Sequence, residues 1–254
     1  MLTHKHFQIA YPPAVSSDDD SNPTAASLIV TIDGPAGSGK STLARQLALR
    51  LGLDFLDTGA MYRGIAAKSI ERGIDIANEP YYVVELARNC PLHFDWQTDP
   101  PRLIARGMDI TNRLRDPDVT GAVSDVAAIG AVRNVLVDQQ RLIGEEHPRL
   151  VTEGRDQGSI VFPKADMKFY LDASPAVRAQ RRAEQLREMG KPVQLEAIRK
   201  NIIERDRKDS TRSDGPLICP DDATRIDTSK MTLDEVLDLL EQNVRVRVGE
   251  RIEQ

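Results

Sequence analysis

The chain has 254 residues, and 34 lysines and arginines against 39 aspartates and glutamates give a formal net charge of −5 at pH 7. That balance argues against a protein that coats nucleic acid, and 40% hydrophobic with 29% charged residues excludes a disordered or collagen-like chain. No apolar run approaches the about 18 residues of a membrane helix, and none follows the early basic residue as in an export signal. Cys90 and Cys219 lack disulfide or zinc spacing. We expect a cytoplasmic protein with two ordinary thiols and neither a membrane nor a nucleic-acid polymer as partner.

The beginning of the chain differs in composition from the rest. It contains three prolines and a run of serines and aspartates at residues 16–21, with few apolar residues at any regular spacing. Such a sequence cannot bury enough apolar surface to fold by itself. It predicts a disordered N-terminal extension over residues 1–27.

A strand, a loop, a helix and a second strand are predicted next. The run Leu-Ile-Val-Thr-Ile at residues 28–32 is typical of a strand buried on both faces. Three leucines then recur every four residues from 43 to 51, and Gly52 stands where a helix takes its left-handed cap. Residues 53–57 favour another strand. This βαβ order predicts a parallel sheet covered by helices.

Further elements follow along the chain. Strands are expected at residues 150–153, 167–172 and 224–227, and helices at residues 175–189, 194–210 and 233–244. The starts of two of these helices are marked by capping pairs, Ser174 with Pro175 and Thr232 with Glu235. About ninety residues precede residue 150, and their weaker strands, at 91–94 and 102–105, indicate an inserted subdomain.

Residues 34–41 read Gly-Pro-Ala-Gly-Ser-Gly-Lys-Ser, a full match to the phosphate-binding pattern G-x-x-x-x-G-K-[ST]. Glycines let successive backbone N–H groups point at a phosphate, and the following helix adds its positive dipole end. Lys40 is expected to reach the β- and γ-phosphates, and the Ser41 hydroxyl to ligate Mg²⁺. A glycine-rich turn with a solvated lysine is the alternative. The predicted ATP-binding residues are Gly34, Pro35, Ala36, Gly37, Ser38, Gly39, Lys40, Ser41 and Thr42.

This motif does not say what receives the phosphoryl group. The chain has no N-K-x-D guanine signature, which argues against a GTPase switch. Residues 178–212 carry eight arginines and three lysines against six acidic residues, so this segment is locally +5. Arginines that close on a transferring phosphoryl group can raise its rate about 10³- to 10⁵-fold. The segment therefore predicts an arginine-rich lid, with a solvated helical face of i,i+4 ion pairs as the alternative.

Five segments together resemble bacterial-type cytidylate kinases, a family of nucleoside monophosphate kinases. They are residues 32–42, residues 57–63 (Asp-Thr-Gly-Ala-Met-Tyr-Arg), residues 124–128 (Ser-Asp-Val-Ala-Ala), residues 153–158 (Glu-Gly-Arg-Asp-Gln-Gly) and residues 205–212. The resemblance covers residues 28–245 and implies an α/β P-loop NTPase fold, whose central parallel sheet is flanked by helices. It implies a CORE of residues 28–61, 149–174 and 213–254, an NMP-binding insertion of residues 62–148 and a short helical LID of residues 175–212.

The acceptor site that the resemblance implies is drawn from most parts of the chain. The cytosine would be framed by Thr58, Ser124, Arg133 and Asp156. Arg63 and Arg155 would bind the CMP phosphate, and Asp209 with Arg205 would bind the ribose. Arg212 would join the phosphate or the base side. The implied catalytic residues are Lys40, Arg155 and the LID arginines Arg178 and Arg182. From the residues alone, a helix-packing role for Ser124 and a surface charge at Arg133 are the simpler interpretations.

The resemblance implies in-line transfer of the γ-phosphoryl group of MgATP to CMP or dCMP, giving ADP and CDP or dCDP without a covalent intermediate. Mg²⁺ is the expected cofactor, these nucleotides are the expected partners, and a monomer is expected. A kinase for UMP, AMP or a non-nucleotide alcohol is an alternative, and so is an ATP-dependent switch that orders its lid around a protein. The net charge and the few aromatic residues disfavour a polynucleotide kinase.

Overall fold

The computed structural model describes residues 27–188 and 190–252, without the side chains of residues 250–252. Two expectations therefore lie outside the described residues. One is the N-terminal extension, apart from its last residue, and the other is the last residue of the helix predicted at residues 175–189.

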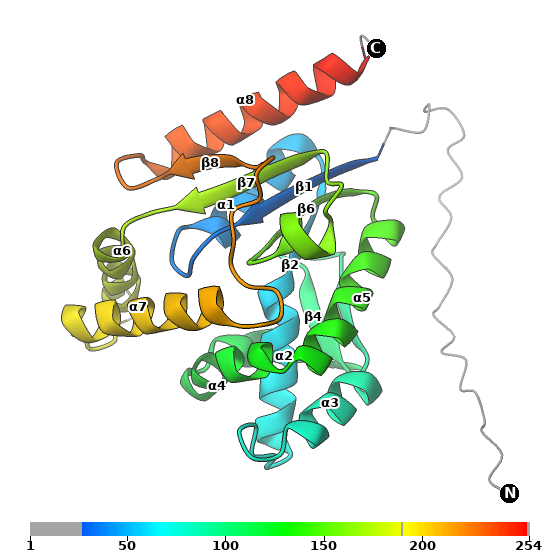
Figure 1. The fold of residues 1–254 in the computed structure, drawn as a ribbon, viewed down its shortest axis with the longest axis vertical. Helices are drawn as coiled ribbons and strands as arrows, with labels where there is room; N and C mark the ends of the chain where they lie inside the picture. The colour runs from blue at the N-terminus through cyan, green and yellow to red at the C-terminus, as the bar shows by residue number, and fades with distance from the viewer. Residues whose placement is uncertain (1–26, 189, 253–254) are drawn as a thin grey trace, which may run out of the picture.

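A five-stranded parallel sheet forms the centre of the molecule (Figure 1). Its strands, in spatial order, are β2 (Asp54–Asp57), β6 (Arg149–Gly154), β1 (Leu28–Asp33), β7 (Met167–Asp172) and β8 (Thr224–Asp227). Because Asp33 pairs with Gly154 and with Tyr170, and Asp57 with Glu153, four of the strands end at the same edge of the sheet. All five predicted strands and their parallel arrangement are confirmed.

Helices cover both faces of the sheet, and each face has its own apolar core. α1 (Lys40–Leu51) and α8 (Leu233–Ile252) pack on one face, where Leu47 and Leu240 are buried in one cluster. Val151 of β6 joins that cluster, whereas the preceding Leu150 is buried in the other. This alternation is the strand period of two, and a sheet buried on both faces needs apolar residues at both kinds of position.

The other core extends into an insertion between β2 and β6. Its elements are α2 (Thr58–Glu71), α3 (Pro80–Asn89), β3 (Leu92–Asp95), β4 (Arg102–Ala105), β5 (Met108–Asp109), the 3₁₀ turn η1 (Thr111–Arg115), α4 (Pro117–Ala128) and α5 (Gly130–Glu146). β3, β4 and β5 form a small antiparallel sheet, which confirms the two weaker predicted strands. α2 passes through residues 61 and 62, so the predicted boundary between CORE and insertion falls inside one continuous helix.

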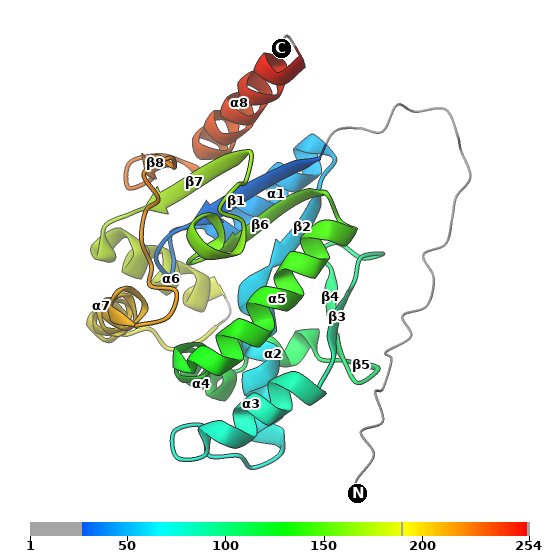
Figure 2. The same cartoon turned by 45° about the vertical axis from the view of Figure 1, so that its right-hand side comes forward.

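Two charged helices, α6 (Pro175–Glu188) and α7 (Leu195–Thr211), follow β7 and pack against each other (Figures 1 and 2). Both predicted helix starts are confirmed, since Ser174 Oγ accepts from the Val177 N–H at 3.3 Å and Glu235 accepts from the Thr232 N–H at 2.8 Å. A single π-helical turn, η2 (Gln157–Val161), follows β6 and was not predicted.

Membrane spans were sought by helix length and hydropathy. Within residues 27–188 and 190–252, no single helix is both long and apolar enough to cross a bilayer. The pair α4 and α5, bent by 95° at their junction, meets the criterion by length and composition alone.

Candidate active site

The loop between β1 and α1 is shaped by glycines. Gly34, Gly37 and Gly39 have φ of 146°, 80° and 93°, which residues with a side chain rarely adopt. A Cβ at Gly34 would lie 2.0 Å from the carbonyl oxygen of Leu171 on β7, so no larger residue fits there. The loop delivers the chain to the N-terminus of α1, where free N–H groups and the helix dipole favour an anion.

Lys40 and Ser41 open α1 directly after these glycines. Lys40 is 4% exposed, and its Nζ donates to the carbonyl oxygen of Pro35 at 2.8 Å. Burial, followed by repulsion from Arg155, lowers the pKa of Lys40. Ser41 Oγ donates to Glu153 Oε1 at 2.6 Å. A polyphosphate bound in the loop would add negative charge beside Lys40 and so raise its pKa again.

Three carboxylates lie at the ends of the strands beside the loop, and sequence reasoning had assigned none of them to the site. Asp33 on β1 accepts from the backbone N–H groups of Gln157 and Gly158 at 2.9 and 2.7 Å, and burial raises its pKa to about 6. Burial and the nearby Asp57 raise the pKa of Glu153. The signal was in the sequence, because each is an acidic residue at the carboxyl end of a predicted parallel strand.

Half-buried arginines gather next to these carboxylates. Arg155 Nε donates to Asp209 Oδ2 on α7 at 2.9 Å, and Arg63 Nη2 on α2 donates to Asp57 Oδ2 at 2.7 Å. Burial, with repulsion from Arg155, lowers the pKa of Arg205 to about 10. The Nε groups of Arg63 and Arg205 are buried without a hydrogen-bond partner among the described residues. Orphaned donors in a cluster of cations favour a bound anion.

A second buried cluster lies beside the arginines. Arg133 on α5 and Asp156 are 3% and 4% exposed and form a hydrogen-bonded ion pair. The ring of Tyr62 lies under the Arg133 guanidinium, 5.6 Å from its central carbon, and Arg212 Nε donates to the carbonyl oxygen of Gly215. Gly215 has φ of 59°, and a Cβ there would lie 2.0 Å from Arg133 Nη2. The cluster offers an arginine fork and a carboxylate together, which can bind a polar edge of a base.

The two predicted hydroxyl ligands lie in different places. Thr58 begins α2, and its buried Oγ1 donates to the backbone oxygen of Glu153 at 2.7 Å. The hydroxyl therefore lies between the ends of β2 and β6, beside the carboxylates. Ser124 is half-buried on α4, where the adjacent Asp125 forms an ion pair of 3.3 Å with Lys208 on α7. The structure places α4, which carries Ser124, against α7, and among the described residues no hydrogen bond joins Ser124 to Arg133 or Asp156.

The two predicted LID arginines differ in their surroundings. Arg178 is 3% exposed and donates to the carbonyl oxygens of Ala173 and Ala36 at 2.8 and 3.0 Å and to Asp206 Oδ2 at 2.7 Å. It therefore joins the end of β7, the glycine loop and α7. Arg182, one turn later on α6, is exposed, and its one hydrogen bond within the described ranges is to Gln185 on its own helix, at 3.3 Å.

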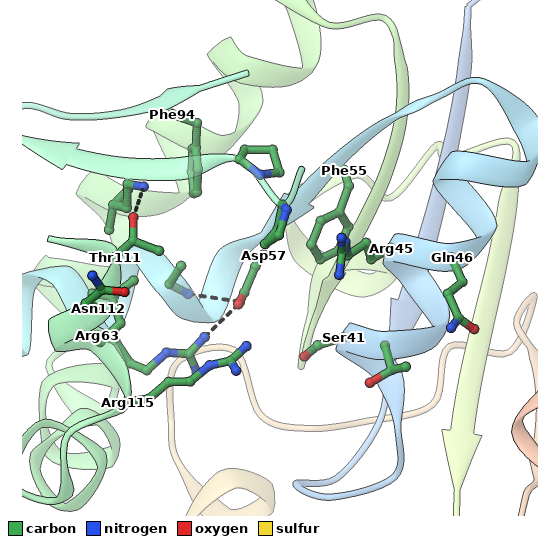
Figure 3. Close-up of a pocket in the computed structure, with 16 residues that line it drawn as sticks. Ser41, Arg45, Gln46, Phe55, Asp57, Arg63, Phe94, Thr111, Asn112 and Arg115 are labelled. Atoms are coloured by element: carbon green, nitrogen blue, oxygen red, sulfur yellow. Dashed lines mark hydrogen bonds and ion pairs between the residues drawn. The ribbon is translucent and has the colours of Figure 1, made fainter. Parts of the chain in front are cut away.

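A pocket of about 370 Å³ opens between α1 and the insertion (Figure 3). It is lined by residues from α1, β2, α2, the β3–β4 hairpin and η1. Ser41, Asp57 and Arg63 lie on its wall, so it adjoins the site described above. On the outer side, Arg45 of α1 binds Asp99 of the hairpin through two oxygens, at 2.7 and 2.9 Å.

Comparison with known proteins agrees with this arrangement of groups. The family model described as cytidylate kinase matches residues 30–246. The chain belongs to the cytidylate kinase family. A protein named cytidylate kinase from Desulforamulus reducens is 43% identical over 208 residues, which cover 82% of this chain and 92% of that protein.

Other relatives are longer. A protein named bifunctional pantoate ligase/cytidylate kinase from Synechococcus sp. is 46% identical over 226 residues, 88% of this chain and 46% of that protein. The chain spans about half the length of this relative and of others with the same name. A solved shikimate kinase from Bacteroides thetaiotaomicron shares 14% identity with a TM-score of 0.43, covering 87% of this chain and 99% of that one. We base no conclusion on that structural likeness.

Members of this family are kinases, so the site was tested for its fit to a divalent metal ion. The described residues contain no group of three or more His, Cys, Asp or Glu side chains that could hold a metal by themselves. The Ser41 hydroxyl and the carboxylates of Glu153 and Asp57 are hard oxygen donors, the type that Mg²⁺ prefers. They fit an ion that also takes ligands from phosphate oxygens. Cys90 and Cys219 are free thiols.

Proposed function

We propose that this protein transfers the γ-phosphoryl group of MgATP to CMP or dCMP, giving ADP and CDP or dCDP. The observation that carries the proposal is the proximity of Lys40 to the arginine cluster. Ser41, the next residue, donates to Glu153 Oε1 at 2.6 Å, and Glu153 precedes Arg155 by two positions. Lys40 in the glycine loop and the arginines Arg155 and Arg205 are close enough to lower the pKa of Lys40 by mutual repulsion. Two phosphate groups bound at these cations would therefore be neighbours, as phosphoryl transfer requires.

The donor nucleotide would occupy the glycine loop, with Lys40 at its terminal phosphates. Mg²⁺ held near Ser41 and Glu153 would neutralise charge on the β- and γ-phosphates. Beyond Arg178 the chain forms an open hollow lined by residues of β7, β8 and α6, among them Ser174 and Asp227. We assign this hollow to the nucleoside of ATP, because Arg178, which lines it, also donates to the carbonyl oxygen of Ala36 in the glycine loop.

The acceptor phosphate would lie among Arg63, Arg155 and Arg205. The Nε groups of Arg63 and Arg205 have no hydrogen-bond acceptor in the described part of the chain. The charge of the phosphate would compensate three guanidinium groups that burial holds together. The transfer needs no covalent intermediate, since positioning and charge neutralisation supply most of the acceleration.

Selection of cytosine is assigned to Arg133 and Asp156. An ionised Asp156 accepts from the exocyclic amine of cytosine, while the Arg133 fork donates to its ring nitrogen and carbonyl. Uracil presents a carbonyl where cytosine presents the amine, which would leave the buried carboxylate facing an acceptor. Burial already raises the pKa of Asp156, against the pull of Arg133, so this carboxylate tolerates a missing donor poorly.

The domain division also belongs to this proposal. Residues 28–61, 149–174 and 213–254 would form the CORE, residues 62–148 the NMP-binding insertion and residues 175–212 the LID. Closure of α6 and α7 would bring Arg182 toward the transferring phosphoryl and exclude water, which otherwise competes as acceptor. A monomer and a cytoplasmic location are part of the same proposal.

The deciding experiment is ADP release from MgATP, followed by a coupled assay with CMP, dCMP, UMP, AMP and GMP offered separately. Turnover with CMP and dCMP but little with AMP or GMP is the expected result. Equal turnover with UMP would remove the role of Asp156 in selection. Tight ATP binding without turnover on any of the five nucleotides would support the donor site alone. It would favour the alternative of an ATP-dependent switch that orders its lid around a protein.

A further inference from the structure

The 3₁₀ turn η1 carries an arginine, Arg115, that neither the sequence motifs nor the proposed mechanism uses. It lines the same pocket as Ser41, Asp57 and Arg63. In the view of Figure 3 the Arg115 and Arg63 side chains overlap, and both guanidinium groups point toward the part of the pocket where Asp57 and Ser41 lie. An arginine of the insertion therefore faces the edge of the site where the two phosphate groups are proposed to meet.

The backbone that carries Arg115 is firmly anchored. The Thr111 hydroxyl at the start of η1 accepts from the Leu103 N–H at 2.9 Å, and the Ile110 N–H donates to the Leu103 carbonyl oxygen at 3.0 Å. Leu114, next to Arg115, is 5% exposed and belongs to the core of the insertion. Because these contacts fix the turn on β4, the direction of Arg115 is set by the folded insertion and not by a free loop.

The charges around Arg115 distinguish it from its neighbours. Arg113 on the same turn forms ion pairs with Asp116 and Asp118 and does not line the pocket. Arg63 is paired with Asp57 at 2.7 Å. Arg115 has no hydrogen bond or ion pair to any residue in the part of the chain that the structure describes. The Asp57 carboxylate thus pairs with Arg63 alone, and an anion between the two guanidinium groups and Ser41 would provide Arg115 with a partner.

We propose that Arg115 binds the phosphate of the acceptor nucleotide from the insertion side, together with Arg63, and completes the cluster formed by Arg155 and Arg205. The inference rests on the proposed function and adds a residue to its acceptor site. A solvated surface arginine is the competing explanation, since the side chain is exposed. That explanation predicts no effect on the acceptor, and the experiment below separates the two.

The test compares Arg115→Ala with Arg113→Ala, a matched loss of one arginine from the same turn. Both variants and the unaltered chain are assayed with CMP at saturating MgATP and with MgATP at saturating CMP. Arg115→Ala is expected to lower kcat/KM for CMP about 10- to 100-fold, the usual weight of a hydrogen bond to a charged group, and to leave KM for ATP within about twofold. Arg115→Lys, which keeps the charge, should recover part of the loss, and Arg113→Ala should stay close to the unaltered chain.

The outcomes are distinguishable. Equal kcat/KM for CMP in Arg115→Ala and Arg113→Ala would overturn the inference and leave the proposed function standing. A loss in Arg115→Ala that Arg115→Lys does not relieve and that accompanies a lower Tm would also overturn it, because it would indicate damage to the insertion. Absence of CMP turnover by the unaltered chain would overturn the proposed function and this inference with it.

Discussion

The donor and acceptor sides of the candidate site are built in opposite ways. The donor side is one continuous stretch, residues 34–42, that binds mainly through backbone groups whose directions three glycines set. The acceptor side is assembled from side chains on five separate elements, whose charges balance one another only in the folded chain. A contiguous backbone site has its geometry encoded locally, whereas an assembled site depends on how distant helices pack.

The largest effect is expected from removing the one charged side chain that the donor loop contributes. Lys40→Ala should reduce kcat roughly 10³-fold, because no other group of the loop can neutralise the terminal phosphates. The steady-state rate with CMP and MgATP measures it. Lys164→Ala, an exposed lysine lost from the loop after η2, is the control and should leave kcat unchanged. Near-normal activity of Lys40→Ala would remove the glycine loop as the donor site.

On the acceptor side, Asp156→Asn should raise KM for CMP about 100-fold with KM for ATP within about twofold. The amide keeps the shape of the carboxylate but offers Arg133 and the cytosine amine a weaker acceptor. It can also donate to a carbonyl, so the preference for CMP over UMP should fall. Asp138→Asn, whose side chain is 75% exposed on α5, is the matched control. Equal changes in KM for CMP and KM for ATP would show that Asp156 does not act on the acceptor side alone.

Gly215→Ala should raise KM for CMP by about tenfold, since its Cβ would displace Arg133 from a buried position. The control is Gly52→Ala, because Gly52 has nearly the same φ, 61° against 59°, and its Cβ would meet nothing within 4 Å. Both variants carry the same backbone strain of about 1–2 kcal/mol, measurable as a lower Tm. Only Gly215→Ala should change KM, and an equal KM in the two variants would contradict the role of Arg133.

The smallest effect on rate is expected at Asp33, which ends β1 and accepts from the backbone N–H groups of Gln157 and Gly158. Its effect on the stability of the protein is measurable. Burial raises its pKa from 3.8 to about 6, so the unfolded chain ionises first as pH rises. The contribution of Asp33 to the free energy of unfolding is therefore fully present below pH 3.8 and lost as pH rises through about 6, by roughly 3 kcal/mol.

Chemical denaturation of the unaltered chain and of Asp33→Asn, repeated between pH 4 and pH 7, measures this dependence. As pH rises to about 6, the unfolding free energy of the unaltered chain should fall relative to that of Asp33→Asn. Above that pH the difference between the two proteins should stay constant. Parallel pH profiles would show that the carboxyl titrates normally despite its burial.

The sequence predicted the fold well because the sheet follows from local patterns. Short apolar runs marked its strands, and the pairs Ser174 with Pro175 and Thr232 with Glu235 marked two helix starts that the hydrogen bonds confirm. The insertion was recognised mainly as a gap. η1 and α4 were not predicted, although Val119, Val123 and Val126 of α4 lie buried at helical spacing. Their positions depend on packing against α2, which is tertiary information.

The candidate site divides in the same way. The glycine loop could be predicted from eight consecutive residues. Arg133 and Asp156 are 23 residues apart, and in the sequence only the resemblance to the family connects them. Glu153 was overlooked although it precedes Arg155 by two positions, because only the folded sheet brings it to Ser41. Arg178 and Arg182 look equivalent in sequence, and the structure alone separates the buried one from the exposed one.

Consecutive residues of α7 address both sides of the site, with Asp206 bonded to Arg178 at the glycine loop and Arg205 beside Arg155. A nucleotide bound on either side would therefore act on the same helix. Thermodynamic reciprocity then requires that any factor by which a bound, non-hydrolysed ATP changes the affinity for CMP is the factor by which CMP changes the affinity for that ATP. The order in which the substrates arrive affects the kinetics of loading, while the fully loaded complex has the same free energy by either route.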